Sequence, residues 1–429
     1  MSYLKSKVAW TLYYFLLAPL LSLTLMVSII RLVGIRNKIK KADHVVVIPD
    51  GGFGQTIAGP DTARRLFKGE NTVCIIFERN QHNSLLGLLW PDILVVFIPF
   101  IWRFNVLGIR YDWELHLPAK KLLGAWLIRW LDQRLNAKVI HLNDVYELAC
   151  DFAVVDSAAA QYGSHHIVGR AHLINSVRVP EAKLPTEISS KIRAKISQYS
   201  QGGNGRTPKK LCCLYLRGKG FGNADLTSAR RTGSDLETYL PAVKLLMKAG
   251  YTVLLTGDRI PDEKYQMEYN HQLVCAKWAG VEPRLFSLFA ATDSDIWIGN
   301  LGGGTPLPCT TSIPKLAVEI FPFGAGIPNS TLYFKTVKDA NGELVHYSKL
   351  FRDHVFDYEM PGWMVLNNTP EQITAAVSSF LEELEHPEVD DESQRILESL
   401  PDHFLSKHVN GRISPAWLRL FDNSEMIAS

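Results

Sequence analysis

The chain has 429 residues, of which 47% are apolar and 21% are charged, an ordinary composition for a globular protein. Because single hydrophobic cores stop growing beyond about 250–300 residues, this length predicts two domains. A net charge of +3, without a zinc-finger, helix-turn-helix or RNA-binding pattern, argues against a nucleic-acid partner.

The cysteines form neither a disulfide framework nor a zinc-binding spacing. They are scattered through apolar runs, which favours buried thiols in a reducing compartment, the cytoplasm. The cysteines are Cys74, Cys150, Cys212, Cys213, Cys275 and Cys309.

The first predicted element is a transmembrane helix over residues 8–30. This segment contains no charged residue and, at a rise of ~1.5 Å per residue, is long enough to cross a ~30 Å hydrocarbon core. A cleaved signal peptide is the alternative, but it would have a shorter apolar region and end at a small-residue site. Ser28-Ile-Ile-Arg31 follows instead.

Basic residues on the two sides of this segment predict its orientation. Lys5 and Lys7 precede it, whereas a larger basic group follows it, namely Arg31, Arg36, Lys38, Lys40 and Lys41. The positive-inside rule therefore places the body of the protein at the cytoplasmic face of the inner membrane, as a single-pass protein.

Two later stretches are further candidates for membrane contact. Residues 85–109 are apolar, but Trp90-Pro91-Asp92, Pro99 and Arg103 interrupt them, which argues against a second span. Residues 120–131 combine tryptophans and leucines with cations, a pattern typical of an interfacial helix. A core helix with cationic ends is the alternative.

Residues 42–190 are predicted to form one α/β domain that opens like a Rossmann fold. A buried strand over residues 43–49 leads into the glycine turn Asp50-Gly-Gly-Phe-Gly-Gln55 and a helix through Arg65. Further strands are predicted over residues 71–77, 138–142 and 152–155.

Residues 180–207 are dense in Pro, Ser, Gly and charge, and residues 201–206 are predicted to be a flexible hinge. The α/β pattern then restarts as a second domain over residues 208–366. Its strands are expected at 211–216, 252–256 and 296–298, with helices at 237–249 and 284–291.

The third part, residues 367–429, begins with a clear helix signal. Thr369 can cap the helix, Pro370 suits its first turn, and apolar residues recur from Ile373 to Leu381 at helical spacing. These C-terminal helices are expected to pack back across both domains.

The most informative stretch is residues 294–308, where an apolar strand runs into Gly302, Gly303, Gly304 and Thr305. Glycines let a phosphate approach the backbone, and a helix starting at 305–308 would add its free N–H groups. A tight turn without a ligand is the alternative, and the glycines alone do not decide between the two.

Other polar residues follow the strands of the second domain, where open α/β sheets place ligands. Arg217 and Lys219 are candidates for diphosphate contacts, because guanidinium and ammonium groups pair with phosphate. Asp258 is a candidate for a ribose hydroxyl and Arg259 for phosphate. Glu319 is either a nucleoside contact or a sheet-end residue bound to the backbone.

The first domain offers candidates for a general base. A transferase needs such a base to take a proton from the acceptor hydroxyl. Asp50 is the candidate because it stands at a strand end, whereas Asp61 is expected at a helix start. His165 and His166 lack a third metal ligand and are interpreted as a polar turn; no metal site is expected.

These motifs resemble a bacterial glycosyltransferase family of GT-B fold, which has two Rossmann-like domains. The resemblance lies in residues 214–219, 230–243, 250–258, 294–304 and 411–415. The glycine turns at residues 51–55 and 296–304 are more distantly similar to heptosyltransferases.

The resemblance implies transfer of a sugar from a nucleotide diphosphate sugar to a cell-envelope glycan or lipid-linked acceptor, as in lipopolysaccharide or capsule synthesis. Inversion without metal or cofactor is expected, with the donor held by the second domain. Gly52, Gly54 and Gln55 would lie on the acceptor side. Gln55 stands where a heptosyltransferase carries its catalytic aspartate, and residues 301–304 replace a serine-containing turn.

Two alternatives stay open. A nucleotide-sugar 2-epimerase shares the two-domain fold, although it needs no membrane anchor. A non-catalytic, membrane-tethered scaffold that binds sugar nucleotides would explain the altered turns at Gln55 and Leu301.

Overall fold

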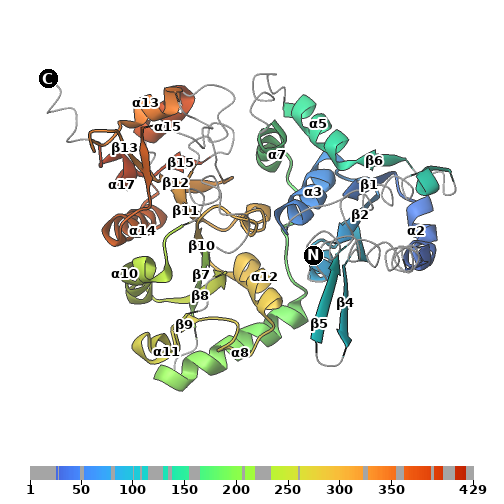
Figure 1. The fold of residues 1–429 in the computed structure, drawn as a ribbon, viewed down its shortest axis with the longest axis horizontal. Coiled ribbons are helices and arrows are strands. Elements are labelled where there is room, and N and C mark those ends of the chain that lie inside the picture. The colour runs from blue at the N-terminus through green and yellow to red at the C-terminus, as the bar shows by residue number, and fades with distance from the viewer. Residues whose placement is uncertain are drawn as a thin grey trace, which may run out of the picture. The chain divides into compact units, whose positions relative to one another are not determined.

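Parallel strands organise both halves of the chain in the computed structural model (Figure 1). The structure describes residues 26–27, 29–48, 53–78, 83–99, 101–106, 109–114, 129–133, 138–153, 165–204, 208–217, 233–258, 261–321, 327–353, 362–387, 391–399 and 411–421. The chain divides into unit 1, Met1–Val145, and unit 2, Tyr146–Ser429. The boundary lies inside helix α5 (Leu142–Ala153).

Unit 1 contains a four-stranded parallel sheet in the order β3-β2-β1-β6. Its elements are α2 (Arg36–Lys40), β1 (His44–Ile48), α3 (Phe53–Leu66), β2 (Thr72–Glu78), the 3-10 helix η1 (Asn83–Leu88), β3 (Leu94–Pro99), β4 (Ile101–Val106), β5 (Ile109–Glu114) and β6 (Val139–His141). Strands β4 and β5 form a separate antiparallel hairpin.

Strand β1 is buried along its whole length because both faces of the sheet are covered. Val45 and Val47 pack in one cluster with Leu32 and Ile39. On α3, a Cβ added at Gly59 would come within 2.8 Å of Ile48 Cδ1. The glycine therefore lets α3 approach the end of β1.

Residues 29–41 are consequently part of the unit 1 core and not a linker between anchor and domain. Leu32 and Ile39 are fully buried, and the guanidinium of Arg31 donates to the carbonyl of Phe97. The predicted span over residues 8–30 lies almost wholly outside the described residues. Among the helices that the structure describes, none is long and apolar enough to cross a membrane.

Unit 2 contains a seven-stranded parallel sheet in the order β15-β12-β11-β10-β7-β8-β9. Its helices include α7 (His165–Ser176), α8 (Thr186–Asn204), α10 (Leu236–Lys248), α11 (Lys264–Glu268), α12 (Pro283–Asp293), α13 (Tyr347–Asp353), α14 (Pro370–Glu385), α15 (Asp391–Ser399) and α17 (Pro415–Leu418), with the 3-10 helix η2 (Pro308–Thr310). Its strands are β7 (Lys210–Leu216), β8 (Tyr251–Gly257), β9 (Leu273–Val274), β10 (Ile296–Gly299), β11 (Lys315–Ile320), β12 (Ser330–Phe334), β13 (Thr336–Lys338), β14 (Met364–Leu366) and β15 (Arg412–Ile413).

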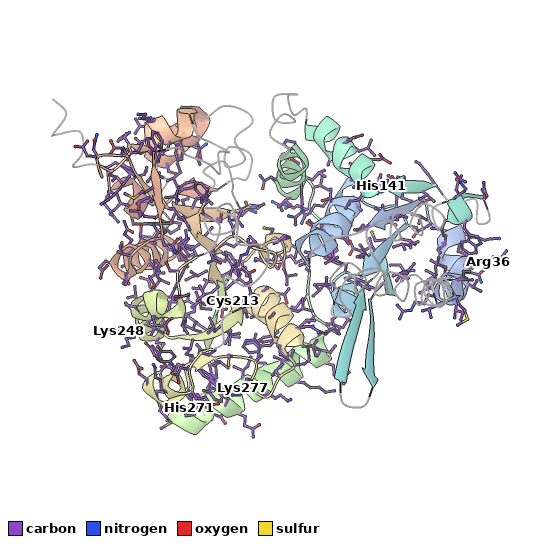
Figure 2. All side chains as sticks on the ribbon, viewed as in Figure 1. Arg36, His141, Cys213, Lys248, His271 and Lys277 are labelled. Atoms are coloured by element: carbon purple, nitrogen blue, oxygen red, sulfur yellow. The ribbon has the colours of Figure 1, made fainter. Side chains whose placement is uncertain are left out.

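Helices cover both faces of this sheet: α10 and α14 lie on one side and α12 on the other (Figure 1), and α8 packs against α12. Cys213 lies in the interior between them, whereas Lys248 and Lys277 lie at the periphery (Figure 2). Burial raises the pKa of the Cys213 thiol to about 12. The described cysteines, other than Cys150, are free and buried as expected.

Several predicted elements differ from the structure. Residues 201–204 of the hinge expected over 201–206 form the last turn of α8, a long amphipathic helix that packs against α12, and residues 205–206 lie outside the described residues. Phe152 and Ala153, expected in a strand, end helix α5. The start of α14 agrees with the prediction: Thr369 and Gln372 form a capping box.

If residues 29–41 belong to the core, two isoleucines should respond differently to truncation. Ile39→Ala should lower the free energy of unfolding of unit 1 by about 2–5 kcal/mol, because it leaves a cavity. Ile30→Ala, at a 62% exposed position, should change it by less than about 0.5 kcal/mol. Urea unfolding of both variants measures the difference; equal effects would mean that this segment is a tether.

Candidate functional site

The strand order of unit 2 creates a switch point between β7 and β10. From β7 the chain proceeds through β8 to β9 on one side, and then returns to β10, β11 and β12 on the other side. Connections that leave two neighbouring parallel strands in opposite directions open a crevice beyond their carboxyl ends. The candidate site is therefore at the ends of β7 and β10.

The structure brings several predicted site residues to this edge of the sheet. Arg217 follows β7, Asp258 follows β8, Gly302–Thr305 follow β10, and Glu319 is in β11. The predicted residues Asp50, Gly52, Lys219 and Arg259 lie outside the described residues.

The glycine turn after β10 packs against the ring of Tyr215. A Cβ added at Gly302 would lie 2.5 Å from the Tyr215 hydroxyl, and one at Gly304 would lie 2.7 Å from its Cε2. Neither glycine has a positive φ. Space for this ring, and not backbone conformation, is therefore the immediate reason for both glycines.

Three N–H groups of Gly302–Thr305 are used inside the protein, and one of them, Thr305 N–H, donates to the carbonyl of Gly302 at 3.1 Å. Gly302 N–H donates to Thr305 Oγ1 at 2.8 Å, and Gly304 N–H donates to the Tyr215 hydroxyl at 3.2 Å. The Gly303 N–H donates to no atom of the described residues. The helix expected at 305–308 is only the three-residue η2, so it contributes no substantial dipole.

Arg217 lies beside this turn. Its backbone N–H donates to Asn300 Oδ1 at 2.9 Å, and its Cδ would be 3.1 Å from a Cβ at Gly302. Because Oδ1 must accept from Arg217, the Asn300 amide is held in one orientation. Its Nδ2 is then a buried donor that has no partner within the described parts of the chain.

Asp258 is exposed at the end of β8. The preceding Gly257 has φ +99°, and a Cβ there would lie 2.1 Å from the carbonyl of Leu216. This close approach lets Asp258 N–H donate to the same carbonyl at 3.1 Å. The carboxylate is consequently held near the end of β7, where it acts electrostatically on Tyr215 together with Arg217.

Glu319 is a buried sheet-end residue. Its carboxylate accepts from Ser234 N–H at 2.8 Å, from Ser234 Oγ at 2.6 Å and from the Tyr239 hydroxyl at 2.6 Å. Its φ is +55°, where a residue with a Cβ is strained, at an irregularity in the pairing of β11 with β12. The three hydrogen bonds offset that strain and favour the structural interpretation of Glu319.

The pKa values of Tyr239 and Lys335 are shifted in directions that agree with this hydrogen-bond network. Burial, followed by the negative charge of Glu319, raises the pKa of Tyr239 well above its ordinary value, so the phenol stays a donor. Burial lowers the pKa of Lys335 to about 8, and Glu319 opposes that shift. Lys335 Nζ donates to Asn367 Oδ1 at 2.5 Å.

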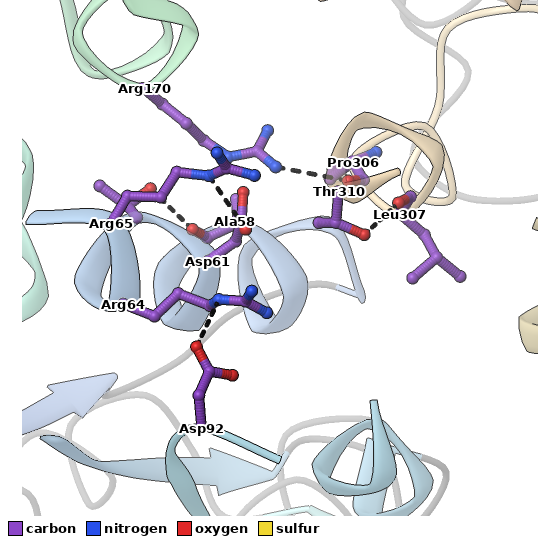
Figure 3. A network of polar contacts seen from close by, with 10 residues as sticks. Ala58, Asp61, Arg64, Arg65, Asp92, Arg170, Pro306, Leu307 and Thr310 are labelled. Atoms are coloured by element: carbon purple, nitrogen blue, oxygen red, sulfur yellow. Dashed lines mark hydrogen bonds and ion pairs between the residues drawn. The ribbon is translucent and has the colours of Figure 1, made fainter. Parts of the chain in front are cut away.

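Helix α7 contacts the residue that follows the Gly302–Thr305 turn. Arg170 donates through Nη2 to the carbonyl of Pro306 at 3.3 Å (Figure 3). His165 and His166, interpreted from the sequence as a polar turn, are instead the first residues of α7.

In unit 1, Asp61 is not a helix-start residue as expected, because α3 begins at Phe53. It is fully buried and pairs with Arg65 at 3.2 Å, while Arg64 pairs with Asp92 at 3.2 Å (Figure 3). Burial lowers the pKa of Arg64, and the carboxylates of Asp61 and Asp92 oppose that shift. The charges of α3 therefore serve the fold.

The sheet of unit 1 also has a switch point, between β1 and β6. Gly54 and Gln55 are in the first turn of α3, which follows β1. His141 ends β6 opposite Val47, and its N–H donates to Asp144 Oδ2 at 3.2 Å. This places the titratable side chain of His141 at the edge where β1 ends, whereas Asp50 lies outside the described residues.

Tyr215, Asn300 and His141 are not among the site residues predicted from the sequence. Each stands at or directly after the end of a predicted strand, so a systematic search of strand ends would have found them. For the residues that the structure describes, no group of His, Cys, Asp and Glu could hold a metal ion.

No protein-family model matches this sequence, and no curated protein matches it. Among solved structures, the glycosyl transferase family 9 protein from Veillonella parvula DSM 2008 is 13% identical, with 79% of this chain and 97% of that chain covered and a TM-score of 0.46. The E. coli ADP-heptose LPS heptosyltransferase II is 13% identical, with 80% and 99% covered and a TM-score of 0.44. Both are glycosyltransferases, the class that the sequence was found to resemble; at these scores, function has to be argued from the residues themselves.

The Tyr215 packing makes Gly304 sensitive to a single methyl group. Gly304→Ala should lower the free energy of unfolding by about 1–3 kcal/mol, because the ring has to move. Gly202→Ala is the control: no atom lies within 4 Å of its added Cβ, and alanine should stabilise that helical position by about 0.5–1 kcal/mol. Thermal unfolding of both variants measures the contrast, and an unaffected Gly304→Ala protein would contradict the packing argument.

Glu319→Gln keeps the shape of the side chain but replaces one acceptor by an amide that donates. It should cost about 2–4 kcal/mol of unfolding free energy, because at least one buried donor loses its partner. Glu187→Gln, in an exposed pair with Lys191, should cost less than about 1 kcal/mol. Urea titration followed by circular dichroism compares them; a Glu319 effect as small as the control would restore the ligand-contact interpretation.

Proposed function

We propose that the chain is a glycosyltransferase that moves a sugar from a nucleotide diphosphate sugar to a cell-envelope glycan or lipid-linked acceptor. The proposal includes inversion at the anomeric carbon, no metal, and no cofactor. Its main support is the position of Arg217, Asp258 and the Gly302–Thr305 turn around the β7–β10 switch point.

The groups at this edge suit a nucleoside diphosphate. Arg217 carries a permanent positive charge beside the turn, and the Gly303 N–H is exposed next to it. Both can bind diphosphate oxygens, and the exposed carboxylate of Asp258 can accept hydrogen bonds from ribose hydroxyls. Lys219 and Arg259 follow the same strands in the sequence and would add charge to the site.

Such a site promotes transfer by stabilising the leaving group. The acceptor oxygen forms a bond to the anomeric carbon while the bond from that carbon to the diphosphate oxygen breaks. Arg217 then offsets the negative charge that develops on the diphosphate, a contribution that is large in a site prepared in advance. A base takes the proton of the acceptor hydroxyl.

Unit 1 is proposed to supply the base. Asp50 follows β1 at the switch point of that sheet, and Gly52, Gly54 and Gln55 belong to the turn that leads into α3. His141 is the second candidate, because it ends the neighbouring strand. Replacing each in turn and measuring turnover with the donor still bound would separate them, because loss of the base abolishes transfer and leaves donor binding unchanged.

The chain is further proposed to be a single-pass protein at the cytoplasmic face of the inner membrane. The uncharged segment over residues 8–30 and the excess of cations after it support this location. A lipid-linked acceptor would be available at such a surface.

A titration with nucleoside diphosphates and nucleotide sugars tests the proposal first. A ligand at 100 times its Kd should add about 2.7 kcal/mol of stability, visible as a rise in Tm. The effective donor is then incubated with and without acceptor glycans. Release of nucleoside diphosphate only with acceptor supports transfer, epimerised donor without acceptor supports the epimerase, and binding without turnover supports a scaffold.

Arg217→Ala should weaken binding of that nucleotide about 10–100-fold, because a charged hydrogen bond is worth about 1.5–3 kcal/mol. Arg178→Ala, at an exposed position of unit 2, is the control with the same loss of charge. Calorimetric titration measures both Kd values. Equal affinities for the two variants would remove Arg217 from the donor site.

A further inference from the structure

Residues 29–34 are helical and lead through a turn at Ile35 into α2 (Arg36–Lys40), and this segment has two faces of different character. On one face, Leu32 and Ile39 are fully buried in the core of unit 1, and Ile35 packs against the same cluster. On the other, Met26, Ile30 and Val33 are exposed by 52%, 62% and 54%. The segment is thus apolar on both sides, although only one side is covered by unit 1.

The three exposed side chains form a patch. Ile30 and Val33 are three residues apart in the helical run 29–34, the spacing that places side chains on one face of a helix, and Met26 precedes Ile30 by four residues. Elsewhere in the described residues, the exposed large hydrophobic side chains are dispersed over both units, at Leu88, Leu148, Met267 and Met364. Isolated exposed hydrophobic residues are ordinary, whereas a contiguous group indicates a contact surface.

The sequence around the patch indicates a lipid surface as the occupant. Met26 and Ile30 are the end of the uncharged segment over residues 8–30. Directly after the patch, exposed cations follow at Arg36, Lys38, Lys40 and Lys41. Apolar residues next to a cationic group match the acyl chains and anionic headgroups of a bilayer interface.

The segment is also fixed to unit 1 at several points. Leu32 and Ile39 anchor it in the core, and Arg31 donates to the carbonyl of Phe97 in β3. A patch on a segment held in this way cannot move independently of the sheet. A bilayer that contacts the patch would therefore set the orientation of unit 1.

We infer that Met26 and residues 29–41 form a membrane-contact surface through which unit 1 rests directly on the bilayer, with Met26, Ile30 and Val33 in the acyl region and the cations at the headgroups. The inference rests on the proposed membrane location and adds the face that lies on the lipid. Unit 1, with the acceptor residues proposed above, is then docked to the membrane and not tethered by a flexible linker.

The test uses the full chain with one reporter cysteine, Val33→Cys or Met267→Cys, each labelled with an environment-sensitive fluorophore. Met267 is 77% exposed in unit 2 and is the matched control for an exposed apolar position. The protein without a reporter cysteine is treated with the same fluorophore, and its fluorescence measures how much the native cysteines are labelled. The labelled chains are reconstituted in vesicles of phosphatidylcholine with and without phosphatidylglycerol.

The label at position 33 should shift to the blue, lose most of its fluorescence to a nitroxide placed high on the lipid acyl chain, and be protected from iodide. The label at position 267 should show no blue shift, keep its fluorescence in the presence of the lipid nitroxide, and be quenched by iodide. Quenching of the position 33 label by iodide, as at position 267, would overturn the inference. So would a blue shift without lipid quenching, because residues 1–25 or a second copy of the chain would then cover the patch.

Two further measurements separate the proposals. Flotation of the chains with vesicles tests the membrane location itself; failure to float overturns both that location and this surface. Donor binding by the labelled chains, measured as for Arg217, tests the transferase proposal and is expected to equal that of the unmodified protein. Lys38→Glu with Lys40→Glu should reduce the iodide protection at position 33 on anionic vesicles only.

Discussion

The pairing of β7 with β10 is the interaction on which the candidate site depends. Cys212–Tyr215 lie beside Ile296–Gly299 in parallel register, although strands β8 and β9 and helices α10, α11 and α12 intervene in the chain. Because the connections diverge from this pair, the groups that end each strand face an open edge. Asn300 then joins the two ends through the N–H of Arg217, so the positions of the cation and of the glycine turn are set together.

Much of this arrangement could be predicted because buried parallel strands have a strong signal. The runs around Val45 and Leu214 are apolar without alternation, which is typical of a sheet covered on both faces. Charged residues directly after such runs, Arg217 and Asp258, then fall at one edge whatever the strand order. Thr369 and Pro370 predicted the start of α14 for an equally local reason, since capping involves only neighbouring residues.

What could not be predicted depends on contacts between distant residues. The glycines of the turn follow from the ring of Tyr215, and Glu319 owes its buried charge to Ser234 and Tyr239. Residues 31–41 have the composition of a linker, but two of their apolar side chains, Leu32 and Ile39, are fully buried in the core of unit 1, whereas Val33 is exposed. Composition averages over both faces of a helix and so hides this division.

The position of β15 has a consequence for how the chain acquires its fold. This two-residue strand completes the sheet by pairing with β12, yet helices α13, α14 and α15 lie between them in the sequence. During synthesis, at about 5–20 residues per second, the edge of β12 stays without its strand for several seconds. An unpaired edge is a template for pairing with other chains, so nascent unit 2 should need protection by a chaperone over that interval.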